Sequence, residues 1–161
     1  MKKRTVHSLV QGSMTAALFA ALTLLSATLG LAVGPFELRL SEALCILPVF
    51  FPSSVPGLFV GCIVGNLLSS CLPVDIVIGS LATLLAALGT RLLRKKPALA
   101  LLPPIFANTI AVPPMLYWLY GFQEVAFPLL VLSIFVGEVL SAGVLGFLLY
   151  KALKPFEKRL M

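Results

Sequence analysis

Long apolar runs separated by short polar stretches dominate the pattern of this chain. A run of about 20 apolar residues forms a helix long enough to cross roughly 30 Å of hydrocarbon. The pattern predicts six helical segments, at residues 8–33, 41–53, 56–72, 75–93, 98–120 and 125–152. These segments take up most of the 161 residues, so we expect an all-α integral membrane protein with one transmembrane domain, residues 1–161.

The composition agrees with a protein that has the bilayer as its solvent. Hydrophobic residues make up 60% of the chain and charged residues 11%, and the mean hydropathy is +1.08. A cleaved signal peptide is an unattractive interpretation, since the first apolar run is about twice the usual length and further membrane segments follow it. We therefore expect residue 1 to be retained and the protein to reside in the cell membrane.

The net charge of +6 does not indicate nucleic-acid binding, because the positions of the basic residues explain it. Eleven of the 12 Lys and Arg residues fall in three clusters. The clusters are Lys2, Lys3 and Arg4; Arg91, Arg94, Lys95 and Lys96; and Lys151, Lys154, Lys158 and Arg159. Six crossings place all three on one side, and the positive-inside rule makes that side cytoplasmic. Both termini are therefore expected in the cytoplasm.

The acidic residues follow the opposite pattern. Glu37, Glu42, Asp75 and Glu124 lie at or near the loops that this topology sends outside, and Glu138 lies within the last segment. Acidic residues contribute little to topology, so the asymmetry indicates an outward-facing site for a polar or cationic solute. A solvated rim is the alternative for Glu37 and Glu124.

The second and third segments are short and are separated by Pro52 and Pro56, so neither is expected to cross the bilayer as a straight helix. Irregular backbone at membrane depth is tolerated only against protein or water. This favours a bundle with a solute cavity at its outer end, roofed by residues 34–41.

Charged residues interrupt the apolar pattern between the first two segments. Glu37, Arg39 and Glu42 lie within nine residues of mostly apolar sequence, Phe36 to Leu44. An ionisable residue at the membrane centre costs roughly 2.5–3.5 kcal/mol, so it normally faces a cavity, pairs with another group or binds a solute. We expect one of these roles here.

Three further polar residues fall at membrane depth. The helix rise puts Glu138 about 20 Å from Lys151, and Asn108 about 18 Å from Lys96. Asn66 lies within the third segment. An unpaired carboxylate at such depth would be protonated or partnered, which favours a functional role for Glu138. For each Asn, an interhelical hydrogen bond that holds the bundle together is an equal alternative.

Small residues recur at four-residue spacing on two segments. They are Gly57, Gly61 and Gly65 on the third segment, and Gly12, Ala16 and Ala20 on the first. Such ridges allow helices to pack closely. We expect the glycines to pack within this chain, whereas contact with a different subunit is an equal alternative for the first segment.

The sequence lacks the motifs of common enzyme classes. The sole histidine, His7, lies at the cytoplasmic edge, so no zinc-protease motif and no Ser–His pair is formed. No phosphate-binding loop occurs, so any use of ATP must come from partners. The cysteines, Cys45, Cys62 and Cys71, have no metal-ligand spacing and are expected to be free thiols. We expect no enzymatic activity and no cofactor or metal.

Three runs carry a resemblance to a known family. They are Arg-Leu-Ser-Glu-Ala-Leu at 39–44, Pro-Gly-Leu-Phe-Val-Gly-Cys at 56–62 and Asp-Ile-Val-Ile-Gly-Ser-Leu-Ala-Thr-Leu at 75–84. With them the chain resembles the queuosine-precursor transporter family, a group of substrate-binding S components of energy-coupling factor transporters. The Ser-Glu-Ala-Leu run and the Asp-x-x-x-Gly-Ser-Leu-Ala-Thr-Leu run are the specific parts of this resemblance.

The resemblance implies a fold and a set of partners. It implies a six-helix bundle of the S-component type that captures a scarce precursor outside the cell. Delivery requires a transmembrane scaffold (T) subunit and two ABC ATPase subunits. In such proteins an Ala-x-x-x-Ala pattern on the first helix meets the scaffold; Ala16 and Ala20 match it, and Ala17 and Ala21 fit equally well.

The implied substrate is a 7-deazaguanine bearing an aminomethyl or nitrile group. A guanine-type edge presents adjacent N–H donors to a carboxylate, and its ring oxygen needs an amide or arginine donor. Glu138 or Glu42 is the candidate for the first role. Candidates for the second role are Asn66, Asn108 and Arg39.

Two further contacts are candidates under this reading. Asp75 is a candidate counter-charge for an aminomethyl ammonium group. Trp118, with Tyr117 and Tyr120, is a candidate for stacking on the flat base, although an aromatic belt at the membrane interface is the commoner reason for such residues.

Other functions stay open at the level of sequence. One is a small oligomeric secondary transporter with Glu138 as a proton-coupled carrier group. Another is an S component for a different flat heterocyclic vitamin, and a third is a purely structural membrane subunit. Residue spacing alone does not separate 7-deazaguanine from another flat heterocycle.

Overall fold

The computed structural model describes residues 2–31 and 37–157, and every regular element among them is helical. The α-helices are α1 (Lys2–Thr28), α2 (Ser54–Leu68), α3 (Pro73–Leu92), α4 (Leu102–Trp118), α5 (Phe127–Glu138) and α6 (Gly146–Leu153). Short helical elements are η1 (Leu40–Val49), η2 (Leu99–Leu101), η3 (Phe122–Glu124), η4 (Val139–Leu145) and η5 (Lys154–Phe156). Lys158, Arg159, residues 34–36 of the expected roof and the side chains of Lys2, Lys3 and Arg4 lie outside what the structure describes.

Four of the helical stretches are long and apolar enough to cross a membrane. They are Thr5–Thr28, Pro73–Leu92, Leu99–Trp118 and Phe127–Phe156. The other two apolar stretches, η1 and α2, are shorter helices, as the prolines in this region predict. The all-α architecture expected from the sequence is thus confirmed.

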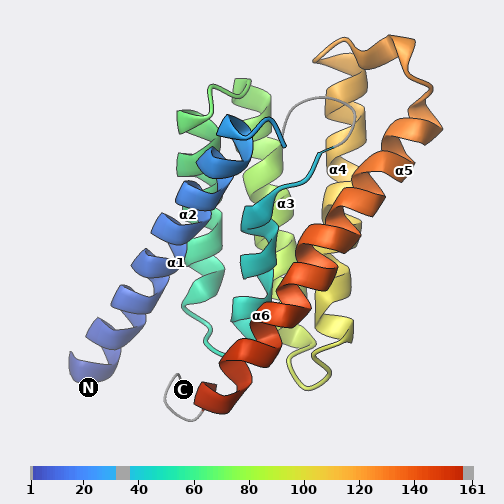
Figure 1. Ribbon diagram of the computed structural model, residues 1–161. Coiled ribbons are helices and arrows are strands. Elements are labelled where there is room, and N and C mark those ends of the chain that lie inside the picture. The colour runs from blue at the N-terminus through green and yellow to red at the C-terminus, as the bar shows by residue number, and fades with distance from the viewer. Residues whose placement is uncertain (1, 32–36, 158–161) are drawn as a thin grey trace.

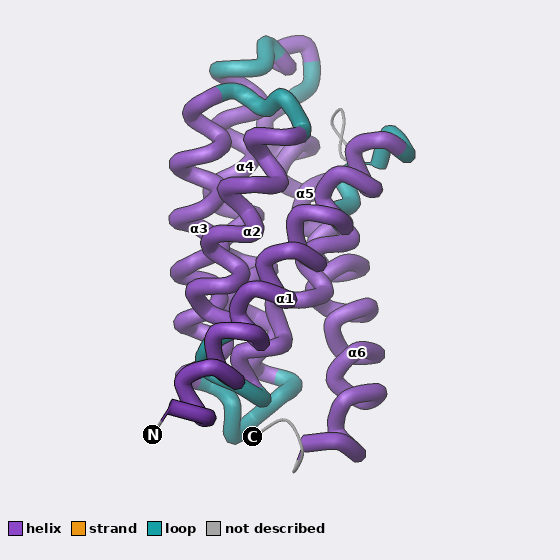
Figure 2. Tube along the Cα trace, turned by 90° about the vertical axis from the view of Figure 1, so that its left-hand side faces the viewer, coloured by secondary structure: helices purple, strands orange, loops and turns teal. Residues whose placement is uncertain are grey.

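Successive segments run in alternate directions, which separates two ends of the bundle (Figure 1). The first turn of α1, the α3–α4 connection and the last turns of α6 lie at one end, which we name the basic end after Arg94, Lys95, Lys96, Lys151 and Lys154. The α2–α3 and α4–α5 connections lie at the opposite end, and the view in Figure 2 agrees. We name this the cavity end.

Helices α1 and α2 pack closely because glycines line the contact. A Cβ atom on Gly57 would lie 2.5 Å from the backbone oxygen of Gly12, and one on Gly61 would lie 2.7 Å from that of Ala16. The expected packing of the glycine ridge within the chain is therefore confirmed. Ala20 is also buried, with 7% of its surface exposed.

The short helix η1 lies in the middle of the bundle, and Cys45 and Ile46 within it and Phe50 directly after it are almost fully buried. The backbone oxygens at its C-terminal end need partners, because the last carbonyls of a helix have none within it. Arg91 of α3 supplies them: its Nη1 lies 2.9 Å from the oxygen of Pro48 and 3.3 Å from that of Val49.

Helices α5 and α6 form one continuous rod through the π-helical stretch η4 (Figure 1). The backbone of Glu37 crosses this rod so closely at Gly137 that any side chain there would collide with the Glu37 carbonyl. Lower down, Gly146 faces Ala43 of η1. The rod therefore holds both Glu138 and the segment that leads into η1.

Candidate functional site

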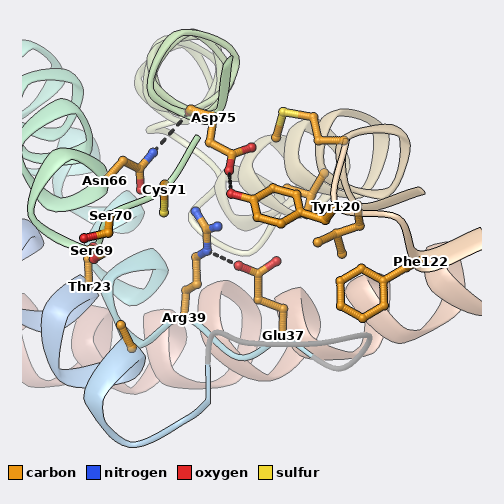
Figure 3. A pocket seen from close by; sticks show the side chains of 14 residues that line it. Thr23, Glu37, Arg39, Asn66, Ser69, Ser70, Cys71, Asp75, Tyr120 and Phe122 are labelled. Carbon is orange, nitrogen blue, oxygen red and sulfur yellow. Dashed lines mark hydrogen bonds and ion pairs between the residues drawn. The ribbon is translucent and has the colours of Figure 1, made fainter. Parts of the chain in front are cut away.

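A cavity of about 220 Å³ opens at the cavity end (Figure 3). Its lining comes from α1, α2, α3 and α4, from the segment before η1 and from the connections at this end. The polar lining residues are Thr23, Glu37, Arg39, Asn66, Ser69, Ser70, Cys71, Asp75 and Tyr120. The apolar lining residues are Ala27, Val112, Met115, Leu116 and Phe122. Polar groups thus converge on a space that is apolar on the α4 side.

Arg39 reaches the cavity from the segment between α1 and η1. Hydrogen bonds anchor the backbone on both sides of it: the N–H of Leu38 donates to Leu31 O at 2.7 Å, and that of Leu40 to Ser26 Oγ at 2.9 Å. The Arg39 Nε donates to Glu37 Oε1 at 2.5 Å. This is the one hydrogen bond of the Arg39 side chain among the described residues, so its terminal nitrogens are available to a solute.

Asp75 lies in the first turn of α3, buried at the cavity wall. The hydroxyl of Tyr120 donates to Asp75 Oδ2 and accepts the N–H of Leu72 at 3.2 Å. Burial and the hydrogen bond to Asp75 raise the pKa of Tyr120 to about 12. Tyr120 thus joins the end of α4 to the start of α3 across the cavity, as Figure 3 shows.

Asn66 of α2 lines the cavity with only 1% of its surface exposed. Its Nδ2 donates to the backbone oxygen of Asp75 at 3.2 Å and contacts Cys62 Sγ at 3.6 Å. No residue in the described part of the chain forms a hydrogen bond with its Oδ1.

A second polar cluster lies deeper in the bundle, outside the residues that line the cavity. Asn108 Nδ2 donates to Glu138 Oε1 at 3.0 Å, and the same amide lies beside Glu42. The thiol of Cys45 donates to Glu42 Oε2 at 3.2 Å. Glu42 and Glu138 are 2% and 6% exposed, and both lie close enough to Arg39 to interact with its charge. We name these four side chains the inner acid cluster.

Trp118, the stacking candidate, does not line the cavity, and the two alanine pairs proposed for the scaffold contact differ in burial. Trp118 is 64% exposed and packs on Tyr117 and Phe127 with ring centroids 5.6 and 5.9 Å apart, in the manner of an interfacial aromatic belt. Ala16 packs against Gly61 of α2 and Ala20 is buried, whereas Ala17 and Ala21 are exposed.

The two acids for which a solvated rim was the alternative differ in position. Glu124 is exposed in η3, as a rim residue would be. Glu37 is buried and lines the cavity.

Comparison with protein families decides the kind of protein that holds this site. The model of the QueT transporter family matches residues 9–155. The chain belongs to the QueT transporter family. It is a multi-pass protein of the cell membrane, as the family and the four long apolar helices together require.

A curated relative agrees with this family. The queuosine precursor transporter QueT of Lactococcus lactis subsp. cremoris (strain MG1363) is 32% identical over 84 residues. That alignment covers 52% of this chain and 49% of the relative, so it spans about half of each protein. No solved structure matches the chain significantly.

Sequence reasoning missed several residues of this family member's cavity. Ser69, Ser70 and Cys71 line it from the α2–α3 connection, where partial burial raises the pKa of the Cys71 thiol. The left-handed backbone of Ser70, with φ of 55°, marks a tight turn that no sequence pattern revealed. Tyr120 was considered only as a stacking residue, whereas its hydroxyl forms a bridge. The expected free thiols are confirmed for all three cysteines.

Proposed function

We propose that this chain is the substrate-binding S component of an energy-coupling factor importer and that it captures a 7-deazaguanine precursor of queuosine without chemically changing it. The cavity that joins Arg39 to the acceptors Glu37, Asp75 and Asn66 carries this proposal. Membership of the QueT transporter family and the name of the Lactococcus relative support the substrate class.

The size of the cavity suits a small ligand. Its volume of about 220 Å³ lies just under the range of roughly 300–1,000 Å³ that is usual for small-molecule sites. A single bicyclic base with a short substituent is a ligand of this class. The apolar wall of Val112, Met115 and Leu116 offers a surface for the flat ring.

The charges around the cavity suit a solute that has many donors. Arg39 is the only basic residue of the chain outside the three terminal and loop clusters. Glu37 and Asp75 line the cavity with it, and Glu42 and Glu138 lie beneath. Acid excess at an outward-facing site attracts an ammonium group, which favours the aminomethyl form of the base over the nitrile form.

The ring carbonyl and the ammonium group of the ligand then have partners. The terminal nitrogens of Arg39 donate to the ring carbonyl, and Asp75 or Glu37 accepts the ammonium group. The inner acid cluster contributes indirectly: the carboxyl groups of Glu42 and Glu138 lie beside Arg39, and Asn108 holds Glu138 in place.

The orientation that we propose has six crossings with both termini in the cytoplasm. The basic residues between α3 and α4 lie at the basic end, as do Lys151 and Lys154. The positive-inside rule assigns this end to the cytoplasm. The cavity then opens outward, where a scarce nutrient is captured.

The proposed partners are a transmembrane scaffold subunit and two ABC ATPase subunits. The outward face of α1, with Ala17 and Ala21, offers a surface of small residues to the scaffold. Ala16 already packs on α2 and Ala20 is buried, so the Ala17 register is the better choice for this contact.

Uptake into proteoliposomes tests this function. The purified chain alone is expected to bind substrate yet give no sustained uptake, and addition of the scaffold and ATPase subunits with ATP is expected to start uptake. Uptake by the chain alone under a proton gradient would instead establish a secondary transporter. For that alternative, Glu138 is the residue to mutate, because its buried Oε2 forms no hydrogen bond with the described part of the chain.

A further inference from the structure

Two cavity-lining residues each carry a buried polar atom that forms no hydrogen bond with any described residue, Asn66 Oδ1 and Ser69 Oγ, and the amide oxygen is the one of the two that can only accept. Asn66 Oδ1 is buried, belongs to a residue that lines the cavity and forms no hydrogen bond. A buried acceptor without a partner costs about 1–3 kcal/mol, so such atoms are rare unless a ligand or water completes them. This atom points to a ligand group.

The neighbours of the Asn66 amide determine which of its two terminal atoms is the nitrogen and which is the oxygen. Nδ2 lies 3.2 Å from the backbone oxygen of Asp75, which can only accept a hydrogen bond. Exchange of the amide nitrogen and oxygen would bring two acceptors together at that distance. Figure 3 shows the amide nitrogen directed at the Asp75 backbone, which leaves the oxygen as the free atom.

The close approach of Asn66 to α3 depends on a glycine. A Cβ atom on Gly79 would lie 3.1 Å from Asn66 Nδ2, closer than an ordinary contact. The absence of a side chain at Gly79 therefore lets the amide nitrogen lie against α3.

We propose that Asn66 determines substrate specificity as a hydrogen-bond acceptor: its Oδ1 accepts a neutral N–H from the edge of the bound base, while Arg39 donates to the adjacent ring carbonyl. This inference rests on the function proposed above. It reverses the expectation from sequence, in which Asn66 was a candidate donor to the ring oxygen. The class of ligand is a lactam-type heterocycle with N–H donors beside its carbonyl group.

The charges of the cavity assign the neutral donor to Asn66. An ammonium group forms stronger, charge-assisted hydrogen bonds with carboxylates, and Glu37 and Asp75 both line the cavity. The amide oxygen is uncharged, and it is the lining acceptor best matched to the ring N–H or the exocyclic amine. A base in which these donors are blocked leaves Asn66 Oδ1 unpaired and is rejected.

A double-mutant cycle between protein and ligand tests the inference. Binding of 7-aminomethyl-7-deazaguanine, of its analogue without the exocyclic amine and of its N1-methyl analogue is measured calorimetrically for the wild type and for Asn66→Leu. Leucine has the same branched side-chain shape and no acceptor. For the wild type, we expect at least one analogue to bind about 10-fold or more weakly than the parent base.

The variant gives the decisive comparison. Asn66→Leu is expected to bind the parent base about 10-fold or more weakly than the wild type does. In this variant, the difference in affinity between the parent base and that analogue is expected to shrink to about two-fold. If Asn66→Leu weakens all three ligands by the same factor, Asn66 has only a structural role and the inference fails. Absence of binding of the parent base to the wild type would overturn the proposed function, and this inference with it.

A second variant keeps Asn66 in place. The added methyl group of Gly79→Ala displaces Asn66 Nδ2. This variant is expected to bind the parent base several-fold more weakly and to show a smaller difference in affinity between the parent base and the analogue. Gly143→Ala is the matched control, because its added methyl group meets nothing closer than 3.6 Å. Equal selectivity of Gly79→Ala and wild type would contradict the fixed orientation on which the inference depends.

Discussion

Asn108 Nδ2 lies 3.0 Å from Glu138 Oε1, which joins α4 to α5 in the interior of the bundle. Glu138 Oε2 has no partner, so this amide provides the one hydrogen bond of the buried Glu138 carboxyl group among the described residues. We therefore expect this hydrogen bond to stabilise the folded protein.

Substitution Asn108→Leu leaves the Glu138 carboxyl group buried without a donor. We expect the free energy of unfolding to fall by about 1–3 kcal/mol. Glu138→Gln keeps an acceptor for Asn108 and is expected to change stability much less. Thermal unfolding in detergent measures both, and equal stability of Asn108→Leu and wild type would show that the pair does not hold α4 to α5.

Arg39 is expected to dominate ligand binding. Loss of a charged hydrogen bond in Arg39→Gln costs about 1.5–3 kcal/mol, which corresponds to a 10- to 150-fold weaker affinity. Glu138→Gln, which acts only through Arg39, is expected to weaken binding less than 10-fold. The control is Arg94→Gln at the exposed basic end. A larger effect of Glu138→Gln than of Arg39→Gln would place the ligand in the inner acid cluster instead.

The Tyr120 hydroxyl is expected to make stability depend on pH only in strong alkali. The pKa of this residue is raised to about 12 from an ordinary value of 10, so the unfolded chain loses the proton first. The stabilising effect is complete below pH 10 and declines as the pH rises to about 12. Tyr120→Phe is expected to lack this decline. If the free energy of unfolding of the two proteins changed equally with pH over that range, the bridge from Tyr120 to Asp75 would be refuted.

Close packing of α1 on α2 predicts a strong effect of a single methyl group. Gly61→Ala forces the Ala16 backbone to move and is expected to destabilise the protein by about 1–3 kcal/mol. Gly143→Ala, with room for its methyl group, is expected to unfold near the wild-type temperature. A neutral Gly61→Ala would mean that the two helices separate easily.

The outward face of α1 gives a prediction about assembly. Ala17→Trp is expected to leave ligand affinity unchanged and to abolish co-purification with the scaffold subunit, because a bulky side chain blocks close helix contact. Leu85→Trp on exposed α3 is the control for a large side chain at a lipid-facing site. Retained assembly of Ala17→Trp would assign the scaffold contact to another face.

Hydropathy predicted the helices well because apolar runs of membrane length leave few alternatives. The expected segment 75–93 forms α3 (Pro73–Leu92), and 125–152 forms the rod from α5 to α6. The pattern could not reveal the π-helical stretch η4 after Glu138, which packs against η1.

The site was harder to predict than the helices. Membrane depth, estimated from the helix rise, placed Asn108 and Glu138 in the same region, and the two side chains do form a hydrogen bond. It could not assign donor and acceptor roles to Asn66, because these depend on a backbone oxygen of α3. Nor could spacing show that Trp118 faces outward, since the direction of a side chain at a helix end depends on how the helix is rotated in the bundle.

Calorimetric titration of the purified chain with 7-aminomethyl-7-deazaguanine tests the central claim most directly, with guanine, riboflavin, biotin and thiamine as controls. The account predicts tight binding of the first compound alone, and its loss in Arg39→Gln. Binding of none of these compounds, or equal binding of one of the vitamins, would contradict the assignment of this cavity to a queuosine precursor.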